Sequence, residues 1–356
     1  MHRRRGARML ITLIIIGGLL WLVHEHRQNK KAALNAPVTS TMPGNTNLTP
    51  SPTPSSNTEV ADPTSQTFEK VASGNYTFSF VTPDKLTRTY VVHIPKNYDP
   101  AKAYPVLFGF HGGFGHADQF EQSSQFSPLA DQRGFIVVYG QGTEWGLLKA
   151  PVWNGGACCG QAVDAQKNVD DVGYVRTIVT QIKAKYHIDS KRIYTTGMSN
   201  GAIFSNRLAC EAADIFAGAA PVSGTMQITT CTPSKQMPIL MIQGTADTNV
   251  PYEGGPGSGL SGATFIPVVQ AFADWAKRNA CTGPITTTVI PPLETTDGHT
   301  IDKLEYGNCA QPTVLYRING GIHEWPSGDL NANRATKQEP SKALNASKTI
   351  ADFFGL

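Results

Sequence analysis

One short turn constrains the fold of this chain more than any other feature. It is Gly197-Met198-Ser199-Asn200-Gly201, which follows the apolar run 192–196 and precedes a stretch with helical character over 202–210. A glycine on each side of the central serine permits a turn too sharp for larger residues. Such a turn between a strand and a helix lifts the serine hydroxyl to the edge of a parallel sheet. The sequence therefore predicts an α/β architecture with Ser199 at the carboxyl end of a strand.

Apolar runs mark the remaining elements. Residues 104–110 are apolar throughout, as expected of a strand buried on both faces of a parallel sheet. The other predicted strands cover 76–80, 87–94, 134–139, 193–196, 217–222, 238–243 and 313–318. Helices are predicted over 175–186, 200–213, 266–278 and 342–354. Strands that alternate with helices predict an α/β fold with a mostly parallel central sheet and helices on both faces.

The first 67 residues differ from the rest in composition. Residues 1–31 carry seven Lys and Arg and one Glu, so within a total charge of +3 the remaining residues carry −3. An apolar run over 9–23 behind the arginines predicts a secretory signal or, since the cleavage sites after it are poor, a retained membrane anchor. Residues 32–67 are rich in Pro, Ser, Thr and Asn, which predicts a flexible linker. We expect export of a globular domain that spans 68–356, with no basic patch to bind nucleic acid.

Six cysteines in an exported chain predict disulfides. Two pairs are favoured by position: Cys210 and Cys231 flank the helix after the turn and the next strand, and Cys281 and Cys309 flank a Thr-rich segment. Cys158 and Cys159 remain, either as a vicinal disulfide or as free thiols. No Cys-x-x-Cys motif or histidine lies at zinc-ligand spacing, so no metal site is predicted.

Two further residues lie where a serine nucleophile needs partners. Asp247 follows the predicted strand 238–243 and His323 follows the predicted strand 313–318. A histidine accepts the serine proton, and a carboxylate fixes the histidine tautomer and stabilises the imidazolium. Ser199, Asp247 and His323 are therefore the candidate catalytic residues, with no cofactor. The carboxylates at 170, 171, 214 and 274 lie on or beside predicted helices and are poorer candidates.

A glycine-rich segment, His111-Gly112-Gly113-Phe114-Gly115, follows the predicted strand 104–110. Its position is that of an oxyanion loop, whose backbone N–H groups bind the negative oxygen of a tetrahedral intermediate. We expect Gly113 N–H and Asn200 N–H to be the two donors, with His111 bracing the loop. Phe114, Trp153 and Trp325 lie in loops predicted at the same sheet edge. Their aromatic faces are candidate substrate-binding surfaces.

Taken together, these motifs resemble those of an exported esterase family that includes poly(3-hydroxybutyrate) depolymerases, LpqC-type esterases, and feruloyl and acetylxylan esterases of carbohydrate esterase family one. The matching segments are 111–113, 153–160, 169–175, 197–201, 244–247 with 250–252, and 320–326. The resemblance implies an α/β-hydrolase fold and places the family's nucleophile, acid and base on Ser199, Asp247 and His323. Where the family usually has Gly and Thr beside the base, this chain has Ile322 and Glu324. We expect one bulky and one anionic side chain there to alter the leaving-group side of the site.

The resemblance implies hydrolysis of carboxylic esters through an acyl-enzyme, on a polyester oligomer or an acylated polysaccharide fragment. Two other functions are compatible with the same residues. A serine peptidase uses the same three side chains, but the sequence contains no recognisable gating domain that would select peptides. A catalytically silent surface module would instead use the aromatic loops to bind polysaccharide.

Overall fold

The structure is a computed structural model, and it describes residues 68–145, 149–158, 169–259, 262–329 and 339–356. The predicted signal or anchor segment and the predicted linker, residues 1–67, lie outside these ranges. Within the described ranges no helix is both long enough and apolar enough to cross a membrane. Membrane anchoring through residues 9–23 and the division of the chain at residue 68 therefore stay predictions.

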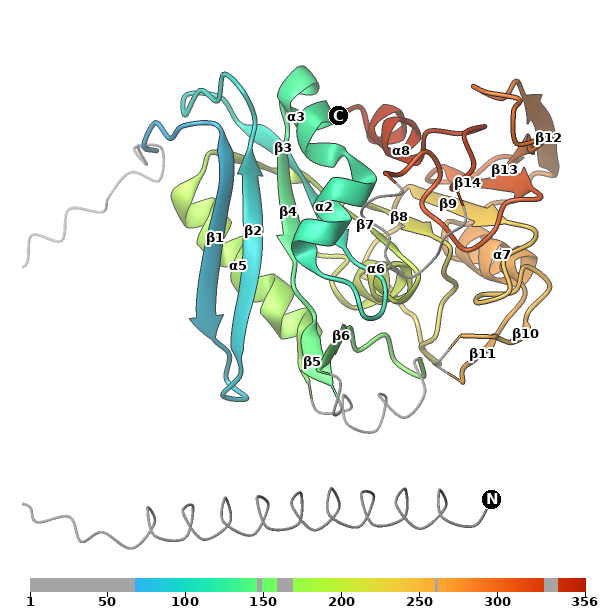
Figure 1. Ribbon diagram of the computed structural model, residues 1–356, viewed down its shortest axis with the longest axis horizontal. Coiled ribbons are helices and arrows are strands. Elements are labelled where there is room, and N and C mark those ends of the chain that lie inside the picture. Colours follow the sequence, from blue (N-terminus) through green and yellow to red (C-terminus); the bar gives the residue numbers. More distant parts are fainter. Residues whose placement is uncertain (1–67, 146–148, 159–168, 260–261, 330–338) are drawn as a thin grey trace, which may run out of the picture. The chain divides into compact units, whose positions relative to one another are not determined.

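A ten-stranded mixed sheet runs through the centre of the described part of the chain (Figure 1). Its strand order is β1-β2-β4-β3-β7-β8-β9-β14-β13-β12. The bounds are β1 Gly74–Val81, β2 Thr87–Ile94, β3 Tyr104–Phe110, β4 Ile136–Gly140, β7 Ile188–Met198, β8 Gly218–Val222, β9 Ile239–Gly244, β12 Ile285–Ile290, β13 Thr300–Tyr306 and β14 Thr313–Asn319. The neighbours from β4 to β14 pair in parallel, and the two strands at each end pair antiparallel. The prediction of a mostly parallel central sheet is confirmed.

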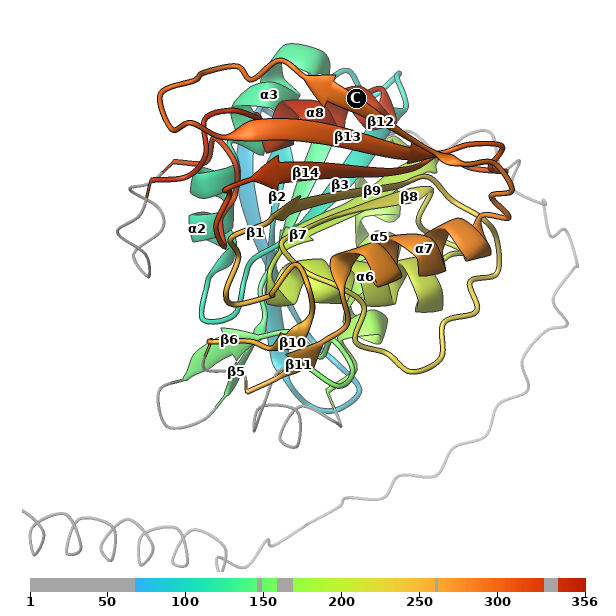
Figure 2. The ribbon, with the colours of Figure 1, turned by 90° about the vertical axis from the view of Figure 1, so that its right-hand side faces the viewer.

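Helices cover both faces of this sheet (Figure 2). One face carries α5 (Asp171–Lys185), α6 (Asn200–Glu211) and α7 (Val268–Arg278). The other face carries α2 (Ala117–Ser124), α3 (Phe126–Arg133) and α8 (Ala346–Phe354). The two helical layers predicted by the alternation of strands and helices are therefore present.

The apolar strands are buried because both of their faces meet a helical layer. Strand β3 is buried at all seven positions. Alternate residues of β3 point to opposite faces, so that Phe108 and Phe110 pack with Phe204 of α6 while Leu107 packs in the cluster formed by α2, α3 and α8. The continuous apolar sequence of this strand is thus explained by its central place in the sheet.

Some elements are absent from the sequence-based prediction. The short helices α2 and α3 have polar sequences, and β12 is exposed at five of its six positions, so that its sequence shows no alternation. Two small hairpins are also added outside the main sheet: β5 (Thr143–Trp145) with β6 (Ala150–Val152), and β10 (Gly255–Pro256) with β11 (Thr264–Phe265).

The parallel strands bring three distant parts of the chain to one sheet edge. Strand β7 ends directly before Ser199, β9 ends at Gly244, and β14 ends at Asn319. Strands β9 and β14 are neighbours in register, with Ile318 opposite Gly244. The loops that follow these strands leave the sheet on the same side, which positions the candidate site.

Candidate active site

Ser199 occupies a strained turn between β7 and α6. Its backbone has φ 55° and ψ −120°, a conformation that residues other than glycine rarely adopt. Hydrogen bonds hold it on both sides, because Ser199 N–H donates to Val222 O (3.0 Å) and Ile203 N–H donates to Ser199 O (2.9 Å). Strain of this kind persists only where the surrounding structure imposes it, and such positions cluster at functional sites. The geometry matches the strand–turn–helix context predicted for the motif.

The two motif glycines are required by close backbone contacts. A Cβ on Gly197 would lie 2.6 Å from the Gly201 carbonyl and 2.7 Å from Phe110 O. A Cβ on Gly201 would lie 2.2 Å from Phe110 O and 2.5 Å from His111 O. Only glycines let the turn rest against the end of β3. That approach brings the loop after β3 beside the serine, since a Cβ on Gly112 would lie 3.5 Å from Ser199 Cβ.

Ser199, His323 and Asp247 form one chain of hydrogen bonds. His323 Nε2 lies 2.9 Å from Ser199 Oγ, and His323 Nδ1 lies 2.8 Å from Asp247 Oδ2. The carboxylate can only accept, so Nδ1 carries the proton and Nε2 presents its lone pair to the serine hydroxyl. The structure thus brings together the three side chains that the sequence singled out.

The Asp247 carboxylate is buried and fully engaged. Its Oδ1 accepts the backbone N–H of Asn249 (2.9 Å) and Val250 (2.8 Å), as in an Asx turn. Its Oδ2 accepts Gln243 Nε2 (2.9 Å) in addition to His323. Gln243 was missed in the sequence, although a polar side chain near the end of the apolar strand β9 is a signal that could have revealed it.

The loop after β3 is braced by a buried neutral histidine. Gly142 N–H donates to His111 Nε2 (2.9 Å), so Nδ1 carries the proton and donates to Gly112 O (2.7 Å). Burial lowers the pKa of His111 to about 4, which keeps the ring neutral at physiological pH. A Cβ on Gly113 would lie 3.8 Å from Asn200 Cβ, so the two expected oxyanion donors belong to neighbouring backbone segments. Within the described residues, Gly113 N–H makes no hydrogen bond.

The prediction that Trp153 offers a substrate-binding face is wrong. The side chain is only 1% exposed, and its ring stacks on Phe204 with a centroid distance of 5.1 Å. Its Nε1–H donates to His111 O (3.0 Å), which places the indole beneath the oxyanion loop. Burial of so large a ring follows from the aromatic partners on β3 and α6, so that Trp153 supports the loop from the core.

Trp325 is also a core residue, in contrast to the prediction. It is 4% exposed, packs edge-on against Phe120 and Phe126, and donates from Nε1 to Ser347 Oγ (3.0 Å). Phe114 differs from both tryptophans, because it is 47% exposed in the loop beside Gly113. Of the three aromatic candidates, Phe114 alone is exposed.

A buried polar network that the sequence did not reveal holds the loop containing Trp153. Trp153 N–H donates to Asn200 Oδ1 (2.7 Å), and Asn200 Nδ2 donates to Trp153 O (3.0 Å). Asn154 N–H donates to Asp171 Oδ2 (2.7 Å), and Asp171 pairs with Arg88 (2.7 Å). The side chain next to the nucleophile thus fixes the neighbouring loop through its backbone.

From the sequence we expected Glu324 to present a charge to the leaving-group side of the site, but the structure does not place it there. Its side chain is buried, and Ser341 N–H donates to its Oε1 (2.7 Å). Burial, reinforced by the nearby Asp297 and Asp247, raises the pKa of Glu324 to about 7. The Ile322 side chain next to His323 is partly exposed.

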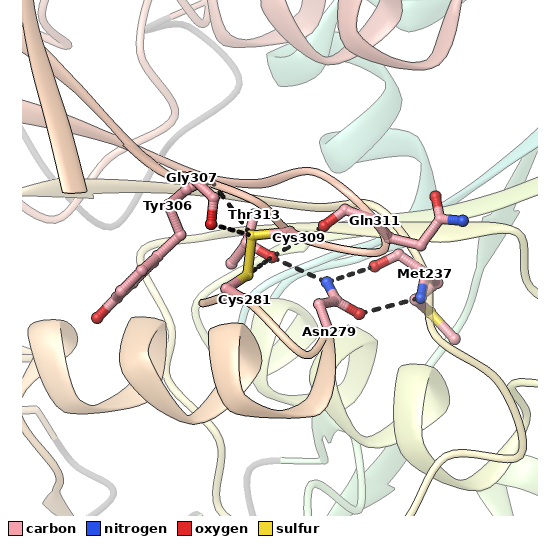
Figure 3. The surroundings of a disulfide bond; sticks show 8 residues. All are labelled: Met237, Asn279, Cys281, Tyr306, Gly307, Cys309, Gln311 and Thr313. Atoms are coloured by element: carbon pink, nitrogen blue, oxygen red, sulfur yellow. Dashed lines mark hydrogen bonds between the residues drawn. A yellow bond between two sulfur atoms is a disulfide. The ribbon is translucent and has the colours of Figure 1, made fainter. Parts of the chain in front are cut away.

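Two of the predicted disulfide pairings are confirmed. Cys210 is bonded to Cys231 at the end of α6, and Cys281 is bonded to Cys309 at the end of α7. Figure 3 shows the second bond beside Asn279, whose side chain donates to Met237 O (2.8 Å) and accepts Met237 N–H (3.2 Å). Cys158 takes part in a disulfide, whereas Cys159 lies outside the described residues. In the described part of the chain, no group of three or more His, Cys, Asp or Glu could hold a metal ion.

Part of the chain is similar to known esterases. Residues 89–250 match the family model described as Esterase PHB depolymerase. The chain is 34% identical over 250 residues to feruloyl esterase B of Piromyces equi, with 68% of this chain and 44% of that protein covered. It is 31% identical over 134 residues to poly(3-hydroxyalkanoate) depolymerase C of Paucimonas lemoignei, with 37% of this chain and 30% of that protein covered. The chain thus spans less than half of the length of either relative.

A solved structure shares the fold. The acetyl xylan esterase from Aspergillus awamori superposes with a TM-score of 0.51 at 16% identity, covering 79% of this chain and 99% of that one. Its likeness, together with the ten-stranded sheet, identifies an α/β-hydrolase fold. Residues 89–250 thus match the family model of the PHB depolymerase esterases.

Proposed function

We propose that the protein is a carboxylic ester hydrolase that works through an acyl-enzyme formed on Ser199. The hydrogen-bond chain from Asp247 through His323 to Ser199 carries this proposal. The family-model match over residues 89–250 supports it, and the relatives compared above have the names of ester hydrolases. These names favour an esterase over a peptidase or a polysaccharide-binding module.

In the first half of the reaction, His323 Nε2 accepts the hydroxyl proton as Ser199 Oγ attacks the ester carbonyl. Negative charge then develops on the carbonyl oxygen, and Gly113 N–H and Asn200 N–H are the proposed donors to it. Asp247 stabilises the imidazolium during this step. His323 next returns its proton to the leaving alkoxide, which departs as the alcohol and leaves the acyl group on Ser199.

In the second half, His323 removes a proton from a water molecule that attacks the acyl-enzyme. The tetrahedral intermediate collapses, Ser199 recovers its proton from His323, and the carboxylic acid is released. The protein groups return to their starting protonation states, so the cycle needs no metal or cofactor.

The substrate we propose is an acylated polysaccharide fragment or a polyester oligomer. The exposed ring of Phe114, on the loop whose Gly112 approaches Ser199, supports a substrate with an extended apolar or aromatic part. The disulfides support function in an oxidising compartment outside the cytoplasm. Product analysis against feruloylated xylan, acetylated xylan and hydroxybutyrate oligomers separates these substrate classes.

The decisive test of the reaction is Ser199→Ala, assayed on short p-nitrophenyl esters. We expect kcat to fall by at least about 10³-fold while the protein remains folded, because the nucleophile is lost. Ser123→Ala, which removes a hydroxyl that donates to Phe120 O within α2, is the control and should keep wild-type turnover. Turnover of Ser199→Ala at the wild-type rate would refute the proposal.

A further inference from the structure

A carboxylic acid is buried directly behind the proposed general base. Glu324 follows His323 in the chain and is 4% exposed. Its Oε1 accepts Ser341 N–H, but within the described residues its Oε2 has no hydrogen-bond partner. A buried carboxylate with an unpaired oxygen is costly when it is ionised, so the neutral acid is the form that this environment favours.

The charged groups around Glu324 reinforce this preference. Asp247 faces it from the loop after β9, and Asp297 faces it from the loop before β13; both raise its pKa. The basic side chains nearby contact other carboxylates, because His299 Nδ1 lies 3.2 Å from Asp297 Oδ2 and Lys342 Nζ lies 3.7 Å from Glu339 Oε2. Among the described residues, no cation pairs with Glu324.

The same residue connects three segments of the site. Ser223 Oγ donates to Glu324 O (3.2 Å), and Ser223 follows β8, whose last residue accepts the N–H of Ser199. The Glu324 side chain reaches Ser341, whose Oγ donates to Asp297 Oδ2 (3.0 Å). Through these bonds the loop that carries His323 is fixed to the nucleophile side and to the segment before α8.

Building on the proposed esterase function, we propose that Glu324 is a positioning residue for His323 that acts as the neutral acid. In this form its Oε1 accepts Ser341 N–H, and no charge opposes Asp247 or Asp297. Ionisation places a third carboxylate charge close to those of Asp247 and Asp297, which loosens the loop 320–326 and moves the imidazole away from Ser199. Turnover is then lost above neutral pH because Glu324, which is not one of the three proposed catalytic residues, releases its proton.

The test compares wild type, Glu324→Gln and Glu324→Thr from about pH 6 to about pH 9, with kcat and KM measured on short p-nitrophenyl esters. The amide and the family's threonine cannot ionise. We expect wild-type kcat to fall by roughly 3- to 10-fold on the alkaline side relative to both variants, with KM little changed, because misplacement of about 1 Å costs up to about 100-fold. Glu294→Gln, an exposed glutamate of the loop before β13, is the matched control and should follow wild type.

Two results would overturn the proposal. One is an alkaline limb that is the same in wild type and in both variants. The other is a uniform loss of kcat at every pH in both variants, which indicates packing alone. If no ester is turned over while fluorophosphonate still labels Ser199, the proposed function fails but the role of Glu324 can still be tested. The labelling rates of wild type, Glu324→Gln and Glu324→Thr are then compared across the same pH range, and their pH dependence supports or overturns that role.

Discussion

Gly201→Ala should damage catalysis far more than its single added methyl group implies. A Cβ at position 201 would lie 2.2 Å from Phe110 O and 2.5 Å from His111 O, and real Cβ atoms essentially never come closer than 3.0 Å to such atoms. The backbone at the end of β3 and the turn that carries Ser199 must therefore separate by at least about 0.8 Å. Both contacts are backbone oxygens, so no side chain can rotate to relieve them.

This separation acts directly on the proposed oxyanion site. Phe110 and His111 lead into Gly113, whereas Gly201 follows Asn200, so the shift moves the two proposed donors apart. A displacement approaching 1 Å costs up to about 100-fold in rate. Overpacking of the core costs roughly 1 to 3 kcal/mol in stability. We expect kcat/KM on short p-nitrophenyl esters to fall by about 100-fold in a protein that still folds, with stability measured by urea unfolding.

The matched control is Gly259→Ala. A Cβ there would meet its nearest neighbour, Asn249, at 3.8 Å, which is an ordinary contact. We expect this variant to keep wild-type activity and stability. If Gly201→Ala retained kcat/KM within about twofold of wild type and unchanged stability, the steric role assigned to this glycine would be refuted.

Two further outcomes follow from the disulfides and from the buried acid. Replacing both Cys210 and Cys231 by serine removes a cross-link over a sequence separation of 21; the chain-entropy model gives a loss of about 3 kcal/mol in the free energy of unfolding, measurable by urea titration, and a loss below about 1 kcal/mol would contradict it. The pKa of Glu324 rises from 4.5 to about 7 on folding, so the group's contribution to stability is complete below about pH 4.5 and is lost as pH rises through about 7. Relative to wild type, Glu324→Gln should therefore gain about 3 kcal/mol in unfolding free energy between pH 4.5 and pH 7.5. A difference between the two proteins that does not change with pH would count against the raised pKa.

The central fold could be predicted because its sequence pattern is produced by burial. Strand β3 is apolar at every position since both faces are covered, and the expected strand over 104–110 coincides with Tyr104–Phe110. The helices predicted over 200–213 and 266–278 correspond to α6 and α7 within two residues at each end. Convergence of the three catalytic candidates also followed from the sequence, because each comes directly after a parallel strand.

Several peripheral elements could not be predicted in this way. Helices α2 and α3 are short and polar, and Gln125 in the left-handed conformation separates them where a glycine would have signalled the end of a helix. Strand β12 is exposed on both sides, so no alternation records its pairing. In both cases tertiary contacts, rather than local sequence, decide the structure.

Residue type and position in the sequence indicated which side chains lie together at the candidate site, but not which side chains around it are buried. The residue types serine, histidine and aspartate indicate the chemistry that they can perform. The sequence around Trp153 does not indicate that its ring stacks on Phe204, which lies 51 residues later. The same holds for Glu324, whose charge looked accessible in the sequence and whose burial follows from contact with Ser341. Side-chain exposure is a property of partners that are distant in the chain.

Each of the three proposed catalytic side chains follows the end of its own parallel strand. Its position is therefore governed by the register between that strand and its neighbours. Other loops at the same rim can be lengthened or rewritten while that offset stays the same. Evolution can consequently change the loops that meet a new ester without moving the three proposed catalytic side chains, and an engineer who grafts foreign loops onto this scaffold can work with the same freedom. This separation between fixed strand ends and variable loops is consistent with the names of the relatives, of which one refers to feruloyl groups and another to polyhydroxyalkanoates.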